Sequence, residues 1–397
     1  MKTKNFYIVL LVITCLKITA AFFIPDIQTW EDHVIAENIL NSGNFYYLND
    51  GAVNHSFQFP VYPVLLSLAL ALYHAPAAGI ILNVLLLAVG CLVLKKNLES
   101  VQKKEWLKLS QNTIHLLCLI PLLHPAFLYY ELKNVHPFTH DFLMLNTGIA
   151  ALLYLTEKSS SKPVEGGIII ALAVLGRGTF IVFPILALLI LIYQKAYKKI
   201  ALSLLGMALM ISPWIIHNYL SDGITGLTST NGKILWKGSL HNSEGGNYLL
   251  NGENYYSALT TEELNQLGHL SVKGQNDFFL EKYKQLITEE PAHVLSVFCI
   301  KLKNFWLLPD HIGKNYPEKL NSFWLVYRLF NFILVVLLLI TLIKHKERWF
   351  LLLPFIAISI LQCWFYFESR HRLLIDPFLF VILTQLLVTS SKSLNAR

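Results

Sequence analysis

The sequence predicts an all-α polytopic membrane protein, a bundle of about ten transmembrane helices with external juxtamembrane helices and one external soluble segment. Three observations predict this class. Hydrophobic residues fill 54% of the 397 positions and charged residues only 14%, which is typical of polytopic membrane proteins. The apolar residues gather in stretches close to the length that crosses a hydrocarbon core of about 30 Å. The charged residues lie mostly between those stretches.

Charge and cysteine usage exclude several other classes. A net charge of +7 can indicate nucleic-acid binding, but most of the lysines fall in short loops between spans, where they set orientation. We therefore expect no nucleic-acid partner. The five cysteines lie in apolar stretches without paired spacing, so neither a disulfide framework nor a zinc ribbon is expected. No glycine-rich phosphate loop is present, which argues against a soluble nucleotide site.

Basic residues set the predicted topology, because they collect on the cytoplasmic side of a membrane. The first apolar stretch, 6–24, lacks a small-residue cleavage site, so we expect a retained span rather than a cleaved signal peptide. With the N-terminus inside, residues 25–60 form an external loop and the lysines at 95–108 lie inside. One full crossing fits between them, 76–94, which leaves 61–73 as a short helix at the outer surface.

The stretch 166–193 has to leave the inner face and return within about 28 residues, too few for two full spans of about 20 residues each. We expect two short helices that turn at Gly176-Arg177-Gly178, with Arg177 at membrane depth near the outer face. The chain then divides into three predicted regions. They are a transmembrane region 1–218, an external segment with a juxtamembrane helix 219–309, and C-terminal transmembrane helices 310–397.

The first external loop carries three carboxylates, Asp26, Glu31 and Asp32, just above the predicted hydrocarbon region. A carboxylate there can act as a general base that deprotonates an attacking hydroxyl or amine. The alternative is that these acids only stabilise a helix start, where Thr29 would serve as the N-cap.

Basic side chains at the predicted outer face are candidates for holding an anion. Arg370, His371 and Arg372 lie between the apolar runs 349–367 and 373–389, on the side where basic residues are scarce. Guanidinium groups bind phosphate well, so a lipid-linked phosphate is the leading candidate. Arg177 is a further candidate because ionisable residues at membrane depth are commonly functional. The alternatives are a structural ion pair for Arg177 and snorkelling to the headgroups for the other arginines.

His140 and Asp141 follow His136 at the start of another predicted span, and they could serve as secondary polar residues of the site. Two histidines four positions apart resemble metal ligands, but no HExxH or paired CxxC motif accompanies them. We expect no resident metal and no other cofactor, with a divalent cation kept as the alternative.

Several motifs, in this order and spacing, resemble those of bacterial family 39 glycosyltransferases. Residues 212–219 (SPWIIHNY) resemble a PWxxRNY block, and residues 229–238 (STNGKILWKG) resemble the STNGGxxLWxG loop that follows it. Residues 368–373 (ESRHRL) with Pro377 resemble an ExRYRxxxxP motif before the final span. Residues 290–306 are similar to a helix of the pattern P…KL…FW, and residues 176–179 (GRGT) resemble an RPT turn.

The resemblance implies the C-type glycosyltransferase fold (GT-C), shared with protein O-mannosyltransferases and the lipid A aminoarabinose transferase. It also implies inverting transfer from a polyprenyl-phosphate sugar to a lipid, glycan or protein acceptor, at the outer face of a bacterial cytoplasmic membrane. An acidic residue of the first loop would act as base, and arginines such as Arg370 and Arg372 would hold the donor phosphate. Asp26 is the first choice for the base, because it precedes the predicted helix.

The sequence departs from the family pattern in three places. Gln28 occupies the spacing of the family's acid from Ala36, His217 replaces the arginine of the PW block, and Gly178 replaces the proline after Arg177. These differences favour an altered substrate or a loss of activity. Two alternative functions therefore stay open, a transporter or flippase of lipid-linked sugars and a non-catalytic membrane partner in polysaccharide assembly.

Overall fold

The computed structural model describes residues 2–106, 108–157, 161–241, 243, 245–310, 321–344 and 346–394. These residues form helices joined by loops, and their only strands are four pieces of two or three residues each. The prediction of an all-α fold is therefore confirmed. The chain divides into two compact units, of which unit 1 contains Met1–Tyr47 and His55–Thr228 and unit 2 contains Leu48–Asn54 and Ser229–Arg397.

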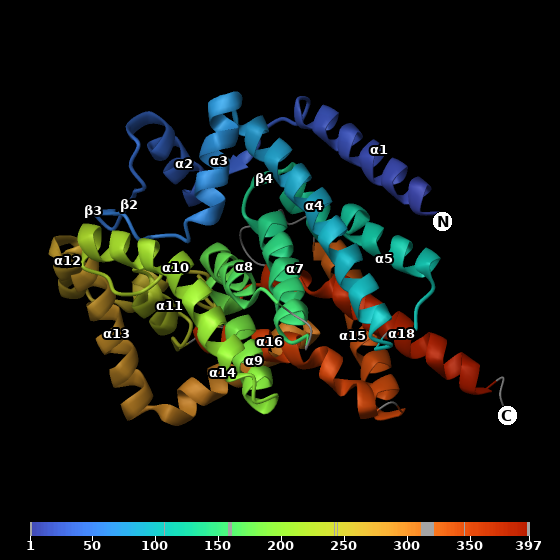
Figure 1. Ribbon diagram of the computed structural model, residues 1–397. Coiled ribbons are helices and arrows are strands. Elements are labelled where there is room, and N and C mark those ends of the chain that lie inside the picture. The colour runs from blue at the N-terminus through green and yellow to red at the C-terminus, as the bar shows by residue number, and fades with distance from the viewer. Residues whose placement is uncertain are drawn as a thin grey trace. The chain divides into compact units, whose positions relative to one another are not determined.

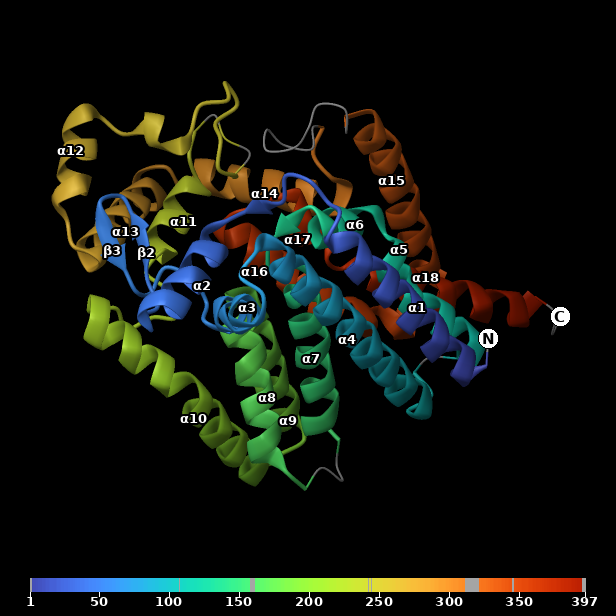
Figure 2. The same ribbon diagram turned by 90° about the horizontal axis from the view of Figure 1, so that it is seen from above.

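The main helices of unit 1 pack against one another in pairs. Helix α4 packs against α7, α7 against α8, and α8 against α10, while α1 and α5 pack against each other and against α4 (Figures 1 and 2). The longer helices are α1 (Thr3–Ala21), α4 (Pro76–Lys103), α5 (Gln111–Leu123), α7 (Phe138–Leu155), α8 (Pro163–Gly176), α9 (Val182–Tyr193) and α10 (Tyr197–Asp222). The shorter elements are α2 (Glu31–Ser42), α3 (Val61–Leu72), α6 (Pro125–Leu132), the 3-10 turn η1 (Gly178–Ile181), β1 (Gln28–Thr29) and β4 (Asn134–Val135).

Two glycines allow α8 and α10 to approach closely. A Cβ atom on Gly167 would lie 2.1 Å from the carbonyl oxygen of Ser203, and one on Gly206 would lie 2.1 Å from that of Val164. Small residues at helix contacts are the usual means of close packing between membrane helices. Lipid is as apolar as the helix surfaces, so the hydrophobic effect does not drive the helices together and close packing has to do so. The two backbones therefore touch at positions that only glycine permits.

Among the described residues, four helices are long and apolar enough to cross a membrane, namely α1, α4, α10 and α15 (Asn321–Lys344) of unit 2. A fifth crossing is added if α5 and α6 count as one span, since they meet at a 50° bend before Pro125. The described helices thus support an integral membrane protein but not about ten full crossings. Several predicted spans are shorter or broken, because proline lacks the N–H that continues the helical hydrogen-bond ladder and glycine lowers helix stability through its conformational freedom.

The short helices expected near the outer face are present. The one expected at 61–73 is α3, of 12 residues. The turn expected at residues 176–178 is also present, because α8 ends at Gly176, Arg177 caps it in an extended conformation, and η1 begins at Gly178. A Cβ atom on Gly178 would lie 2.6 Å from the ring of Phe59. Residue 178 therefore lies against the first loop with no room for a larger side chain.

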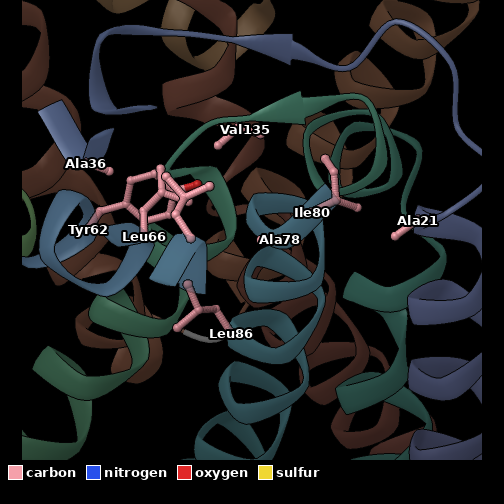
Figure 3. Packing of buried hydrophobic residues seen from close by; sticks show 9 residues of the cluster. Ala21, Ala36, Tyr62, Leu66, Ala78, Ile80, Leu86 and Val135 are labelled. Atoms are coloured by element: carbon pink, nitrogen blue, oxygen red, sulfur yellow. The ribbon is translucent and has the colours of Figure 1, made fainter. Parts of the chain in front are cut away.

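A hydrophobic core anchors the first loop of unit 1 to its helices. Figure 3 shows Tyr62 and Leu66 of α3 beside Val135 of β4, with Ala78 and Ile80 of α4 nearby. These side chains are at least 96% buried. Because the cluster joins α3 to the start of α4 and to β4, it fixes the ends of several helices that carry polar residues.

Unit 2 combines the predicted external segment with the C-terminal helices. Helix α14 packs against α13, α15, α16 and α17, while α11 packs against α13 and α16. The elements are α11 (Asn231–Lys237), the 3-10 turn η2 (Tyr255–Ala258), α12 (Thr261–His269), α13 (Val272–Glu289), α14 (Pro291–Leu307), α15, the 3-10 turn η4 (Lys346–Leu352), α16 (Leu353–Phe365), α17 (Ser369–Leu373) and α18 (Asp376–Leu394).

The tip of a hairpin from the first loop completes unit 2. Its strands are β2 (Tyr47–Asn49) and β3 (Ala52–Asn54), and between them Asp50 has the left-handed φ of 49°. The carboxylate of Asp50 lies 2.5 Å from the Lys233 ammonium and accepts a 2.6 Å hydrogen bond from the Tyr256 hydroxyl. These contacts lie beside a core built around Trp236 and Phe279, so the hairpin tip is held by both charge and packing.

Candidate functional site

The carboxylates of the first loop begin α2. Glu31 and Asp32 occupy its first turn, where the helix dipole favours negative charge. The N-cap is Trp30, which makes no side-chain cap hydrogen bond, so the expectation that Thr29 would cap this helix is wrong. Thr29 instead belongs to β1, whose extended backbone pairs with β4. Asp32 is only 6% exposed.

A short parallel pairing ties this loop to the ends of the unit 1 helices. Gln28 and Thr29 of β1 pair with Asn134 and Val135 of β4, and the Lys133 ammonium donates to the carbonyl oxygen of Pro25 at 2.7 Å. Since β4 lies between α6 and α7, the pairing sets the start of α2 against the start of α7. The acids of both helix starts are thereby placed in one region of unit 1.

Tyr62 lies at the centre of that region. Its hydroxyl donates to the Asn83 side chain of α4 at 2.9 Å, and Asn83 in turn donates to the carbonyl oxygen of Asn134 at 3.0 Å. Burial, and then the negative charge of Asp32, raises the pKa of Tyr62 well above its ordinary value, with a smaller contribution from Asp141. Tyr62 is therefore a neutral donor within the electrostatic field of both carboxylates.

Asp141 pairs with Arg177. The guanidinium of Arg177 donates to Oδ2 of Asp141, which is in the first turn of α7, and also to the Thr179 hydroxyl at 3.2 Å. The side chain of Asp141 is 3% exposed and that of Arg177 is 21% exposed. The pair joins the start of α7 to the break after α8, and it leaves one side of the guanidinium partly accessible.

His140 is fully buried beside this pair. Its Nδ1 lies 3.4 Å from Oδ1 of Asp141, and its ring centroid lies 5.5 Å from that of Tyr62. Neither ring nitrogen makes a hydrogen bond within the described structure. A buried polar group without a hydrogen bond is costly. Such groups are commonly retained for a ligand or for chemistry.

Unit 1 therefore links four of the predicted residues. Arg177 pairs with Asp141, His140 lies next to Asp141 and Tyr62, and the charges of Asp32 and Asp141 act on Tyr62. Unit 1 does not bring Asp26 into the same buried set. Asp26 is exposed at a turn before β1 with a left-handed φ of 51°. Glu31 is half-buried at the first position of α2.

In unit 2 the predicted arginines take two different environments. Arg372 is fully buried, and its guanidinium donates to Asp376 and, at 2.6 Å, to the side chain of Asn331 of α15. The Tyr327 hydroxyl donates to the other oxygen of Asp376. Burial lowers the pKa of Arg372 to about 10, which leaves it charged at neutral pH. Arg372 thus belongs to an internal ion-pair network that joins α15, α17 and α18.

Arg370 is also in α17, and its side chain is 24% exposed. It pairs with Glu368 at 2.8 Å and donates to the Tyr366 hydroxyl at 3.1 Å. Each arginine has a nearby carboxylate as its partner, since Glu368 contacts Arg370 and Asp376 contacts Arg372. His371 is buried, and its Nδ1 accepts from the backbone N–H of Glu368 at 3.2 Å, which caps α17.

Sequence reasoning missed the polar side chains that support these groups. Asn83 in unit 1 and Asn331 in unit 2 are each buried within an apolar helix that is long enough to span a membrane. A lone amide in such a helix is itself a signal, because it has to find a partner inside the protein. Tyr62 gave no such signal, because a tyrosine among leucines is typical of an ordinary hydrophobic core.

No group of three or more His, Cys, Asp or Glu side chains among the described residues is arranged to hold a metal ion. We also compared the chain with known proteins. No protein-family model, curated protein or solved structure matches it. The function therefore has to be argued from the geometry of the two units.

Proposed function

We propose that this chain is a membrane glycosyltransferase that moves a sugar from a polyprenyl-phosphate donor to an acceptor at the outer face of the membrane, with inversion at the anomeric carbon. The observation that carries the proposal is the buried Asp141–Arg177 ion pair together with Asp32 and Asp141, whose charges both act on Tyr62. Buried acids and a cation at the ends of apolar helices supply the groups that this transfer needs close to a lipid headgroup.

Each of these residues has a role in the proposed reaction. Asp32 takes the proton of the acceptor hydroxyl or amine as the acceptor attacks the anomeric carbon. The new glycosidic bond forms while the bond from that carbon to the phosphate oxygen breaks, and polyprenyl phosphate leaves with the bonding electron pair. Asp141 is the positioning residue, because its ion pair with Arg177 fixes both side chains. We prefer Asp32 to Asp26 as the base because it is buried beside Tyr62.

Within unit 2, taken by itself, Arg370 is the arginine that we propose binds a lipid-linked phosphate, and Arg372 is structural. Support comes from their surroundings. Arg370 is partly exposed, whereas Arg372 is fully buried against Asp376 and Asn331. A charge-assisted bond from a guanidinium to a phosphate is stronger than a neutral one, and it strengthens as negative charge develops on the leaving group.

Transfer is tested in membranes that contain the full chain, with a panel of labelled polyprenyl-phosphate sugars and release of polyprenyl phosphate as the readout. We expect release with the unaltered chain and a loss of at least about 100-fold in Asp32→Asn, the usual size of a general-base contribution. Glu165→Gln is the matched control, since Glu165 is an exposed acid in the first turn of α8. Equal release from Asp32→Asn and the control would refute the assignment of the base.

A second candidate function is movement of a lipid-linked sugar across the membrane. It is favoured by the buried ion pair of Lys17 on α1 with Glu131 on α6, at 2.5 Å, because α6 is also the helix that follows the 50° break after α5. Charged pairs and broken helices inside the membrane are common features of transporters. In proteoliposomes, transfer of the intact lipid-linked sugar between leaflets without release of polyprenyl phosphate would support this function over the transferase.

A further inference from the structure

Five half-buried side chains of unit 2 form a closed ring of contacts beside the Arg372 network. Lys237 donates to the side-chain oxygen of Asn247 at 2.6 Å, and Asn247 donates to Glu368 at 2.6 Å. Glu368 pairs with Arg370 at 2.8 Å, and Arg370 donates to the Tyr366 hydroxyl at 3.1 Å. The Lys237 ammonium lies 4.3 Å from the centroid of the Tyr366 ring, which closes the ring as a cation–π contact.

The backbone beneath this ring is held rigidly. Lys301 of α14 is buried and donates to the carbonyl oxygens of Gly238, at 2.7 Å, and Phe365, at 3.0 Å. These residues directly follow Lys237 and directly precede Tyr366 in the sequence. A Cβ atom on Gly238 would lie 1.8 Å from the carbonyl oxygen of Phe365, so only glycine allows the two segments to approach so closely. The backbone N–H of Phe367 donates to the carbonyl oxygen of Gly245 at 3.0 Å.

The charge of the ring suits a phosphodiester. Lys237 and Arg370 are cations at neutral pH and Glu368 is an anion, which leaves one net positive charge in a partly exposed position. A sugar linked to a lipid through one phosphate carries one negative charge, so its binding would neutralise the ring. Amide and carboxylate groups such as those of Asn247 and Glu368 suit the hydroxyl groups of a sugar, because they offer both donors and acceptors.

We propose that Lys237 and Arg370 together bind the phosphate of a lipid-linked sugar, with Asn247 and Glu368 directed to the sugar hydroxyls. This inference rests on the proposed transferase function and names a binding residue, Lys237, that the sequence analysis did not single out. On binding, the phosphate replaces Asn247 as the partner of Lys237 and Glu368 as the partner of Arg370. Lys301 holds the two backbone segments at the correct separation.

Binding is tested with the purified full chain in detergent micelles that contain polyprenyl phosphate, read out as the rise in unfolding temperature with ligand concentration. Lys237→Met should raise the apparent Kd for polyprenyl phosphate about tenfold, the effect of losing about 1.4 kcal/mol. Lys273→Met is the matched control, because Lys273 is an exposed lysine of α13, and it should bind as the unaltered chain does. Equal Kd values in Lys237→Met and the control would overturn the site.

A second variant changes binding in the opposite direction and so excludes a general folding defect. Glu368→Gln leaves the ring with two net positive charges while an amide can still cap α17. It should lower the apparent Kd for polyprenyl phosphate severalfold, and weaker binding in this variant would contradict the charge argument. Inorganic phosphate is added in a separate series. A temperature rise equal to that with polyprenyl phosphate would overturn the assignment to a lipid-linked anion.

The same variants separate this inference from the transferase proposal. If the unaltered chain releases no polyprenyl phosphate from any donor but loses binding in Lys237→Met, the site stands and the transferase proposal fails. If transfer proceeds and Lys237→Met keeps both kcat and KM for the donor, the transferase proposal stands and the site fails. When both hold, Lys237→Met should raise KM for the donor about tenfold, with a smaller change in kcat.

Discussion

The guanidinium of Arg177 forms an ion pair with the carboxylate of Asp141 over a sequence separation of 36 residues. The two residues lie where helices start or stop, Asp141 in the first turn of α7 and Arg177 at the end of α8. The pair therefore holds the break between α8 and α9 against the start of α7. It also places a positive charge beside the carboxylate that lies next to His140.

Removing one partner of this pair should destabilise the protein more than removing both. Arg177→Met leaves the Asp141 carboxylate 3% exposed and without its cation, which should cost about 3 kcal/mol. The double variant Arg177→Met/Asp141→Asn leaves no buried charge and should recover part of that loss. Unfolding temperatures of Arg177→Met, Asp141→Asn and the double variant in detergent provide the measurement. Losses that simply add would show that the two side chains do not interact.

The contact between α8 and α10 should not tolerate a side chain at Gly206. A Cβ atom there would lie 2.1 Å from the carbonyl oxygen of Val164, so Gly206→Leu has to separate two backbones. We expect a fall in unfolding temperature or a failure to fold, read out by yield of monodisperse protein. Gly268→Ala is the control, because nothing lies within 4 Å of its added Cβ. Normal yield of Gly206→Leu would contradict this packing.

Much of the fold could be predicted because apolar stretches and basic clusters are local signals. The sequence places α3 at 61–73 and the turn at residues 176–178, and the structure has α3 at Val61–Leu72 and the break at Arg177. The number of crossings could not be predicted in the same way. Whether a proline such as Pro125 bends a helix or ends it depends on tertiary contacts that replace the lost hydrogen bond.

The candidate site was predictable in its residue types but not in its pairings. Charged residues in apolar surroundings drew attention to Arg177, Arg370 and Arg372. Two of these arginines have partners on distant segments, since Asp141 lies 36 positions from Arg177 and Asn331 lies 41 positions from Arg372. Asp26 is the first choice from the sequence, because it precedes the predicted helix, and only the burial of Asp32 favours the other acid. The spacing of apolar residues along a loop does not predict which of its side chains is buried.

Replacement by methionine should lower stability at Arg372 and donor transfer at Arg370. Arg372→Met leaves Asp376, 1% exposed, without its cation, and should cost about 3 to 5 kcal/mol of stability. Arg370→Met loses a partly exposed contact with Glu368 and should lower the unfolding temperature little while abolishing donor transfer. Thermal unfolding and the transfer assay on the same preparations make the comparison. A stable Arg372→Met variant, or full transfer by Arg370→Met, would contradict the assignment.

Lys301 should make stability depend on alkaline pH. Burial lowers the pKa of its ammonium from 10.5 to about 8. Between these values the unfolded chain holds a proton at this position that the folded protein has released. The free energy of unfolding therefore rises with pH in this window, and the desolvation cost of the charged lysine is relieved.

The comparison with Lys301→Met isolates this effect, because methionine does not titrate and all other groups are shared. Between pH 8 and pH 10 the unaltered chain should gain about 2 kcal/mol relative to Lys301→Met. Lys303→Met is the matched control, because Lys303 is an exposed lysine on the same helix, and its difference from the unaltered chain should stay nearly constant. Chemical unfolding at several pH values provides the measurement. A constant difference for Lys301→Met would mean that its ammonium keeps its ordinary pKa, and that Gly238 and Phe365 are bound by a well-solvated lysine.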